Sequence, residues 1–292
     1  MHRATPRVLV VVAVTLLLSA CGGVRGGGAP AQSVDPITPP STSGGTTGLD
    51  RWEGFSVAKQ PRPIVFLSGP LHWPDNGFVN DSEKIALSYG GVRAPVCYPT
   101  APDTAGGYQL MDAASAFHTL VDVPPNGDGT TETIQATGVA LGTSTFATDR
   151  GPLDLPAWIF QFSGEMAVAV AAVHPKLVFT PLRDKSTTGP AGVPGGGSAT
   201  LSSDGQTLTV SFVGAAEGQG PCTADYAAVL EERANIVGLS VKQVRRGMGQ
   251  VESCPAGGFK RTVTATLTTP LGSRVLADST SGDPIAVTDS KT

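Results

Sequence analysis

Glycine and proline recur along the whole chain, with 37 Gly and 24 Pro in 292 residues. Glycine raises the entropic cost of a helix interior, and proline removes a backbone hydrogen-bond donor from it. This density argues against a coiled coil or a helical bundle. Hydrophobic residues still make up 40% of the chain, which is enough for one or two packed cores. We therefore expect a mainly β protein with α+β character, built from short strands joined by turns.

The net charge of the chain bears on whether it binds nucleic acid. The formal net charge is −4, and no cluster of Lys and Arg stands out. Binding to nucleic acid requires a concentration of positive charge against the phosphates. The composition therefore predicts no nucleic-acid partner.

The first residues have the pattern of an export signal. Arg3 and Arg7 precede an uncharged stretch, residues 8–20, that is too short to span a bilayer comfortably. The residues Leu18-Ser19-Ala20-Cys21 then resemble the lipobox of bacterial lipoproteins, which has an aliphatic residue, two small residues and a cysteine. In that family the cysteine thiol receives a diacylglyceryl group and becomes the new N-terminus after cleavage. The alternative is an ordinary secretory signal followed by a chance cysteine.

The resemblance implies a location as well as a modification. Residues 1–20 would be a signal peptide, and the lipid on Cys21 would hold the chain on the extracytoplasmic face of the cell membrane, since a two-chain anchor is stable. Residues 21–50 are expected to be the lipidated cysteine and a disordered tether, because residues 22–48 consist mostly of Gly, Pro, Ser, Thr and Ala. A flexible tether of this length spans on the order of 30 Å.

A second break in composition lies at residues 185–198, which are rich in Gly, Pro, Ser and Thr. We interpret it as a linker between an α+β domain, residues 51–184, and a β-rich domain, residues 199–292. In the first domain we expect an antiparallel sheet with one helix, because Leu110, Ala114, Phe117 and Val121 are spaced for one helix face. The strands expected there are residues 63–67, 84–89, 133–148, 157–162 and 166–173.

The C-terminal domain is expected to be a β-sandwich or a meander. Residues 199–213 have the pattern of a hairpin, with Asp204-Gly205 as the turn. Residues 226–232 fit either a strand or the start of a helix, and further strands are expected at residues 235–244, 261–267 and 274–278. Residues 261–278 also resemble a pattern that recurs in lipoproteins and secreted proteins of high-GC Gram-positive bacteria, and no known activity accompanies it.

Three cysteines remain once Cys21 is assigned to the lipid. An exported chain meets oxidising conditions, so a disulfide is expected, and Cys97, Cys222 and Cys254 allow three pairings. We favour Cys222 with Cys254, because both lie in the C-terminal segment beside a proline. Cys97 would then be buried and inert, or would pair outside the chain.

The motifs of known chemistry are absent or incomplete. Ser56-Val57-Ala58-Lys59 matches the Ser-x-x-Lys motif of penicillin-recognising serine enzymes, but no helix is expected there and the companion motifs are missing. Residues 122–130 briefly resemble a calcium loop, but Pro124 at the third position offers no side-chain ligand. No spacing of Cys and His suits zinc. We therefore expect no catalytic residues, no metal and no cofactor.

The best candidate for recognition is a loop with His72, Trp73, Asp75 and Phe78 in a Pro- and Gly-rich segment. Aromatic side chains in loops are costly to expose and often contact a partner. The alternative is that Trp73 packs onto the sheet, since Trp is usually buried to a large extent.

Together these features predict a membrane-anchored binding or envelope-structural module without catalysis, whose partner is an envelope protein or a small ligand. One alternative is an envelope hydrolase with residues scattered in sequence, and another is a sensor or accessory subunit that presents its β domains to a membrane partner. A hydrolase would gather polar side chains with perturbed pKa values in one concave site, whereas a binding module would show an apolar patch or an open sheet edge.

Overall fold

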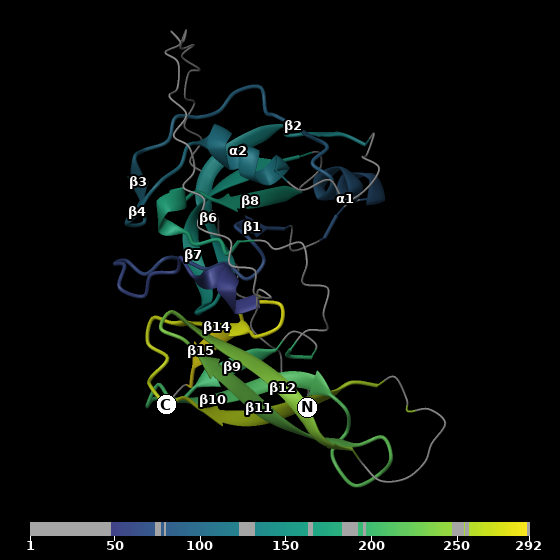
Figure 1. The fold of residues 1–292 in the computed structure, drawn as a ribbon. Helices are drawn as coiled ribbons and strands as arrows, with labels where there is room; N and C mark the ends of the chain where they lie inside the picture. Colours follow the sequence, from purple (N-terminus) through teal and green to yellow (C-terminus); the bar gives the residue numbers. More distant parts are fainter. Residues whose placement is uncertain are drawn as a thin grey trace, which may run out of the picture.

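The structure is a computed structural model that describes residues 48–73, 77–78, 80–122, 132–162, 166–182, 192–194, 197–246, 254 and 257–290. The expected signal peptide, Cys21 and Asp75 lie outside the described residues. The described part is rich in β-strand, which confirms the expected fold class (Figure 1). No described helix is long and apolar enough to cross a membrane.

The helices and strands fall into two halves along the chain. The N-terminal half contains η1 (Gly48–Trp52), β1 (Leu71–His72), α1 (Asp81–Ser88), β2 (Val92–Arg93), β3 (Thr104–Ala105), β4 (Tyr108–Gln109), α2 (Ala113–Val121), β5 (Ile134–Gln135), β6 (Gly138–Thr148), β7 (Gly151–Gln161), β8 (Ala167–Ala171) and η2 (Pro175–Leu177). The C-terminal half contains β9 (Ser198–Leu201), β10 (Thr207–Gly214), β11 (Ala224–Glu232), β12 (Ile236–Arg246), β13 (Phe259–Thr266), β14 (Val275–Asp278) and β15 (Ala286–Asp289).

The main sheet of the N-terminal half is antiparallel, in the order β1-β8-β7-β6. Strand β8 is a run of small apolar residues that is buried on both faces, as the sequence predicted. Helix α2 packs on one face of the sheet and buries Ala113, Ala116, Phe117 and Leu120 (Figure 1). The Asp112 side chain caps the start of α2 by accepting a hydrogen bond from Ser115 N at 2.6 Å. Leu110, which the sequence placed on the helix, therefore lies before its first turn.

The strand expected at residues 84–89 is wrong, because these residues belong mostly to helix α1. The Asn80 side chain accepts a hydrogen bond from Glu83 N at 2.9 Å, which caps the first turn. The N-terminal half therefore has two α-helices in its described part, where the sequence predicted one.

Residues 64–72 connect strand β6 at one edge of this sheet with strand β8 near the other edge. Phe66 bridges to Thr148 at the end of β6, while β1 pairs with β8 at the opposite edge. His72 and Ser144 meet between these edges, with Nδ1 and Oγ 2.5 Å apart. Residues 63–67 thus form isolated bridges, where the sequence predicted a full strand.

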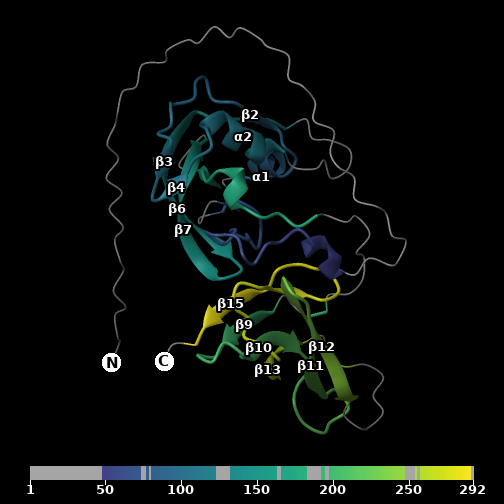
Figure 2. The ribbon, with the colours of Figure 1, turned by 60° about the vertical axis from the view of Figure 1, so that its left-hand side comes forward.

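The C-terminal half is a sandwich of two sheets, ordered β13-β10-β9-β15 and β11-β12-β14 (Figures 1 and 2). Its core contains alternate residues of both sheets: Leu208, Val210, Phe212, Val237, Leu239 and Val241. The expected sandwich is confirmed, and residues 226–232 lie in strand β11 and start no helix. The pairs β12–β14 and β15–β9 are parallel, so the connections are longer than those of a meander.

The hairpin between β9 and β10 is confirmed with its turn. Gly205 adopts a φ of 70°, which an L side chain rarely adopts. The Asp204 carboxylate accepts from the Ser202 hydroxyl and from the backbone N–H groups of Gln206 and Thr207. These hydrogen bonds lower the pKa of Asp204 to about 2.

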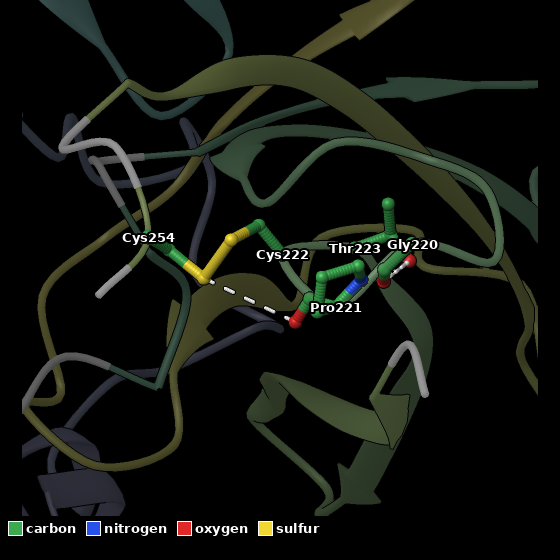
Figure 3. The surroundings of a disulfide bond; sticks show 5 residues. All are labelled: Gly220, Pro221, Cys222, Thr223 and Cys254. Carbon is green, nitrogen blue, oxygen red and sulfur yellow. Dashed lines mark hydrogen bonds between the residues drawn. A yellow bond between two sulfur atoms is a disulfide. The ribbon is translucent and has the colours of Figure 1, made fainter. Parts of the chain in front are cut away.

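The predicted disulfide is present between Cys222 and Cys254, whose Cα atoms are 5.4 Å apart (Figure 3). Beside it, the Thr223 hydroxyl donates to Gly220 O at 2.7 Å. Cys97 is exposed and forms no disulfide, so the expectation that it is buried is wrong. It lies in the irregular segment after β2, where its neighbour Val96 is also exposed. Pairing of Cys97 outside the chain stays a prediction.

Replacing both Cys222 and Cys254 by Ser should lower the free energy of unfolding by about 3–4 kcal/mol, because the bond closes a loop with a sequence separation of 32. Urea unfolding of the oxidised wild type and the double variant measures the difference. Cys97→Ser is the matched control and should leave the stability unchanged. Equal stability of the wild type and the double variant would contradict the expectation.

Helix η1 packs against the sandwich, so residues 48–50, which the sequence predicted to be the end of the disordered tether, are ordered and mostly buried. Leu49 and Trp52 contact Ile236 on the outer face of β12 and Val275 on β14. A Cβ atom at Gly238 would lie 2.5 Å from Leu49 Cδ1, so a larger residue there would displace the buried Leu49 side chain. The two halves therefore share a buried interface.

Part of the expected linker at residues 185–198 also packs on the sandwich. Val193 is buried in the core of the sandwich, and its N–H donates to Asp278 Oδ2 at 2.6 Å. Val241 N donates to Gly192 O at 2.7 Å. Residues 192–194 are therefore fixed to the C-terminal half, while residues 183–191 lie outside the described part.

Candidate functional site

The recognition loop predicted from the sequence is only partly assembled. Trp73 is 37% exposed, and its ring lies 6.0 Å from the ring of Phe78. Phe78 packs against the core of the N-terminal half. His72 contacts Ser144 on β6. The structure thus brings Trp73 and Phe78 together and leaves the Trp73 side chain accessible.

Helix α1 follows this loop in the chain (Figure 1), and it also carries exposed apolar side chains. Ile85 and Tyr89 are 39% and 38% exposed. With Asp81, Lys84 and Ser88 they line an open hollow of 360 Å³. These residues are spaced by three and four positions, so they share one face of the helix. The sequence interpretation missed this face because it assigned a strand, although Asn80 followed by Glu83 is a helix-start signal.

We call Trp73, Ile85 and Tyr89 the exposed apolar group. They come from a loop and a helix within one stretch of the chain, and each is more than a third exposed. Exposed aromatic and aliphatic side chains are typical of surfaces that bind a partner where they are contiguous.

A second region of interest is the buried interface between the two halves, which sequence reasoning missed. Asp149, at the tip of the β6–β7 hairpin, is 1% exposed. Arg62 forms a two-pronged ion pair with it, at 2.5 Å (Nη2–Oδ2) and 3.1 Å (Nη1–Oδ1). The Arg62 guanidinium also donates from Nε to Ser273 O at 3.0 Å and lies over the Phe55 ring. The buried carboxylate is thus fully paired.

Arg150 continues this interface to the C-terminal half. Its Nη2 donates to Gly272 O at 2.7 Å and to Arg274 O at 2.5 Å. Burial lowers the pKa of Arg150, and the positive charge of Arg62 lowers it further. Strand β15 lies beside the tip of the β6–β7 hairpin (Figure 2), and its Val287 N donates a hydrogen bond to Asp149 O at 2.9 Å. These contacts are those of a structural interface.

A small pocket opens beside this interface. It has a volume of 170 Å³ and is lined by Arg62, Asp149, Arg150, Tyr108 and several apolar residues. Ligand pockets of proteins usually measure about 300–1,000 Å³. The pocket is therefore smaller than a usual ligand site.

The described groups with shifted pKa values are dispersed over the molecule. They are Tyr98, Asp112, Arg150, Asp204, Glu232 and Arg233. Backbone hydrogen bonding at the cap of α2 lowers the pKa of Asp112, and a hydrogen bond with Asp50 raises that of Arg233. Each shift has a local structural cause, and these groups share no concave site in the described part of the chain.

No group of three or more His, Cys, Asp or Glu residues that could hold a metal ion occurs among the described residues. No protein-family model, no curated protein and no solved structure matches this chain.

Proposed function

We propose that this chain is a lipid-anchored protein of the extracytoplasmic face of the cell membrane, and that it serves as a binding or structural module of the envelope. The lipobox residues Leu18-Ser19-Ala20-Cys21 support the anchor. The Cys222–Cys254 disulfide supports export, because disulfides persist in oxidising compartments.

The observation that carries the binding role is the contrast between two sets of residues. The exposed apolar group, Trp73, Ile85 and Tyr89, lies in one stretch of the chain. The groups with shifted pKa values, in contrast, are spread over caps, turns and the interface between the halves. Exposed apolar side chains without a gathered set of titratable groups favour binding over catalysis.

Replacing Cys21 by Ala should release the chain from the membrane fraction or leave it unprocessed, because the Cys21 sulfur is the proposed site of lipid attachment. Cell fractionation followed by immunoblotting measures the distribution. Cys97→Ser, which removes another accessible thiol, should fractionate as the wild type does. Unchanged membrane association of the Cys21→Ala chain would overturn the anchor.

The binding role predicts that Trp73→Ala and Tyr89→Ala each reduce retention of the chain on purified cell-envelope fragments. Co-sedimentation with those fragments is the measurement, and both variants should have a melting temperature within a few degrees of the wild type. The control is Val213→Ala, which truncates an apolar side chain that is 46% exposed in the C-terminal half. Equal retention of the wild type and all three variants would contradict the assignment of the binding surface.

One observation favours a second candidate function, an envelope hydrolase. A serine hydroxyl beside an imidazole is the minimal unit of nucleophilic catalysis, and Ser144 Oγ lies 2.5 Å from His72 Nδ1. The same contact also joins two edges of a curled sheet, which is a structural role. Labelling of Ser144 by a fluorophosphonate probe, abolished in Ser144→Ala, would favour the hydrolase; absence of labelling favours the binding role.

A further inference from the structure

The pocket beside the interface of the two halves has mainly apolar walls. Its volume of 170 Å³ is too small for most drug-sized ligands. A cavity of about 150 Å³ can nevertheless hold a molecule of the size of benzene. The apolar part of its described lining consists of six proline and aliphatic side chains: Pro61, Pro63, Ile64, Val65, Leu153 and Leu177. The pocket therefore suits a compact apolar body.

Two polar side chains of the same lining have hydrogen-bonding capacity that the protein does not use. Arg150 directs Nη2 to Gly272 O and Arg274 O, whereas its Nη1 donates to none of the described residues. Its Nε lies 3.8 Å from Asp149 Oδ2, which is beyond hydrogen-bond distance. The Tyr108 hydroxyl also has no partner in the described part of the chain. A ligand with acceptor oxygens can use both donors.

The charges at the pocket favour an anion. Its described lining contains two cations, Arg62 and Arg150, and one carboxylate, Asp149. Arg62 already holds that carboxylate through two hydrogen bonds, so the charge of Arg150 is the less balanced of the two. Asp289 also acts on Arg150 electrostatically, but it is exposed and forms no ion pair with it. An anion beside Arg150 would therefore reduce the repulsion between the two guanidinium groups.

We propose that this pocket binds a small monocarboxylate with a compact apolar body, such as an aromatic or branched-chain acid. The carboxylate accepts hydrogen bonds from Arg150 and Tyr108, because the planar guanidinium matches carboxylate geometry. The apolar body lies against Leu153, Leu177 and the prolines. A strongly hydrated inorganic anion fits less well, since apolar walls cannot replace its water.

The site is independent of the proposed function. It shares no residue with the exposed apolar group, and it requires no lipid on Cys21. A failure of the pocket proposal would therefore leave the anchor and the envelope-binding surface untouched.

Isothermal titration calorimetry of the full chain in a mild detergent, with benzoate as the ligand, tests the site. We expect a dissociation constant on the order of 1 mM, as is typical of so small a ligand. Benzamide has the same shape without the charge and should bind at least tenfold more weakly. Inorganic phosphate should bind no more tightly than benzamide.

Three variants locate the binding site, and circular dichroism checks that each is folded. Arg150→Gln should weaken benzoate binding at least tenfold, and Tyr108→Phe, which removes only the hydroxyl, should weaken it roughly tenfold. Arg150 also joins the two halves, so Leu153→Trp tests the pocket without changing its polar groups. It fills the pocket and should abolish binding. The matched control is Leu182→Trp, at a side chain that is 76% exposed outside the pocket, and it should bind as the wild type does.

Three results would overturn the proposal. The first is that the wild type does not bind benzoate at concentrations up to about 10 mM, roughly ten times the expected constant. The second is that benzamide or phosphate binds as tightly as benzoate, because the ligand class would then be wrong. The third is that Leu153→Trp binds benzoate as the wild type does, because the acid would then occupy another site.

Discussion

Replacing Trp52 by Ala should lower the free energy of unfolding by about 3–5 kcal/mol, because it removes a large, fully buried side chain. Trp52 stacks on Phe179 at 5.5 Å and meets Phe55 edge-on at 6.1 Å. Its Nε1 donates to Gly282 O at 2.8 Å, so the variant also leaves a buried carbonyl without its partner.

Urea unfolding followed by far-ultraviolet circular dichroism measures this loss. Trp73→Ala is the matched control, because the same change at a side chain that is 37% exposed should cost less than about 1 kcal/mol. Similar losses for the two variants would show that η1 does not fix the N-terminal half to the sandwich.

Arg62→Ala should destabilise the chain by about 3 kcal/mol, the low end of the range for breaking a buried ion pair, because it removes the two-pronged partner of the buried Asp149 carboxylate and leaves only Arg150 Nε, 3.8 Å away, as a cation. The variant also loses the hydrogen bond from Arg62 Nε to Ser273 O, which joins the two halves of the chain. Urea unfolding again gives the magnitude.

Two controls distinguish the stability lost with the buried ion pair from the stability lost by removing any arginine. Arg233→Ala removes a guanidinium from partly exposed ion pairs with Asp50 and Glu231, so it should cost only about 1 kcal/mol. The double variant Arg62→Ala/Asp149→Ala removes both charges and should recover part of the loss. A loss in Arg62→Ala no larger than that in Arg233→Ala would contradict the structural role of the pair.

The parts of the fold that were predictable depend on local periodicity. Leu208, Val210 and Phe212 alternate with polar residues, and Asp204-Gly205 supplies a turn, so the β9–β10 hairpin could be located from the sequence. The disulfide was also predictable, because both cysteines lie in the same half and only a few pairings were possible.

The strand expected at residues 84–89 shows where local periodicity fails. Ile85, Leu87 and Tyr89 alternate as in a strand, but Leu87 is buried while Ile85 and Tyr89 are exposed on a helix face. A short segment of this kind fits the two-residue period of a strand and the 3.6-residue period of a helix. The cap at Asn80 favours the helix.

The interface between the halves could not be predicted, because its partners are far apart in the chain. Arg62 and Ser273 are separated by 211 residues, and Trp52 and Gly282 by 230. No local pattern encodes such contacts. The candidate site was predicted in part: Trp73 is exposed as a recognition residue should be, whereas the α1 face was hidden by the wrong strand assignment.

Mass spectrometry of the N-terminal peptide of the membrane-extracted protein tests the proposed anchor most directly. We predict that the mature chain begins at Cys21 and that this residue carries a diacylglyceryl group. A mature chain that begins at another residue, or an unmodified Cys21 in the membrane fraction, would contradict it.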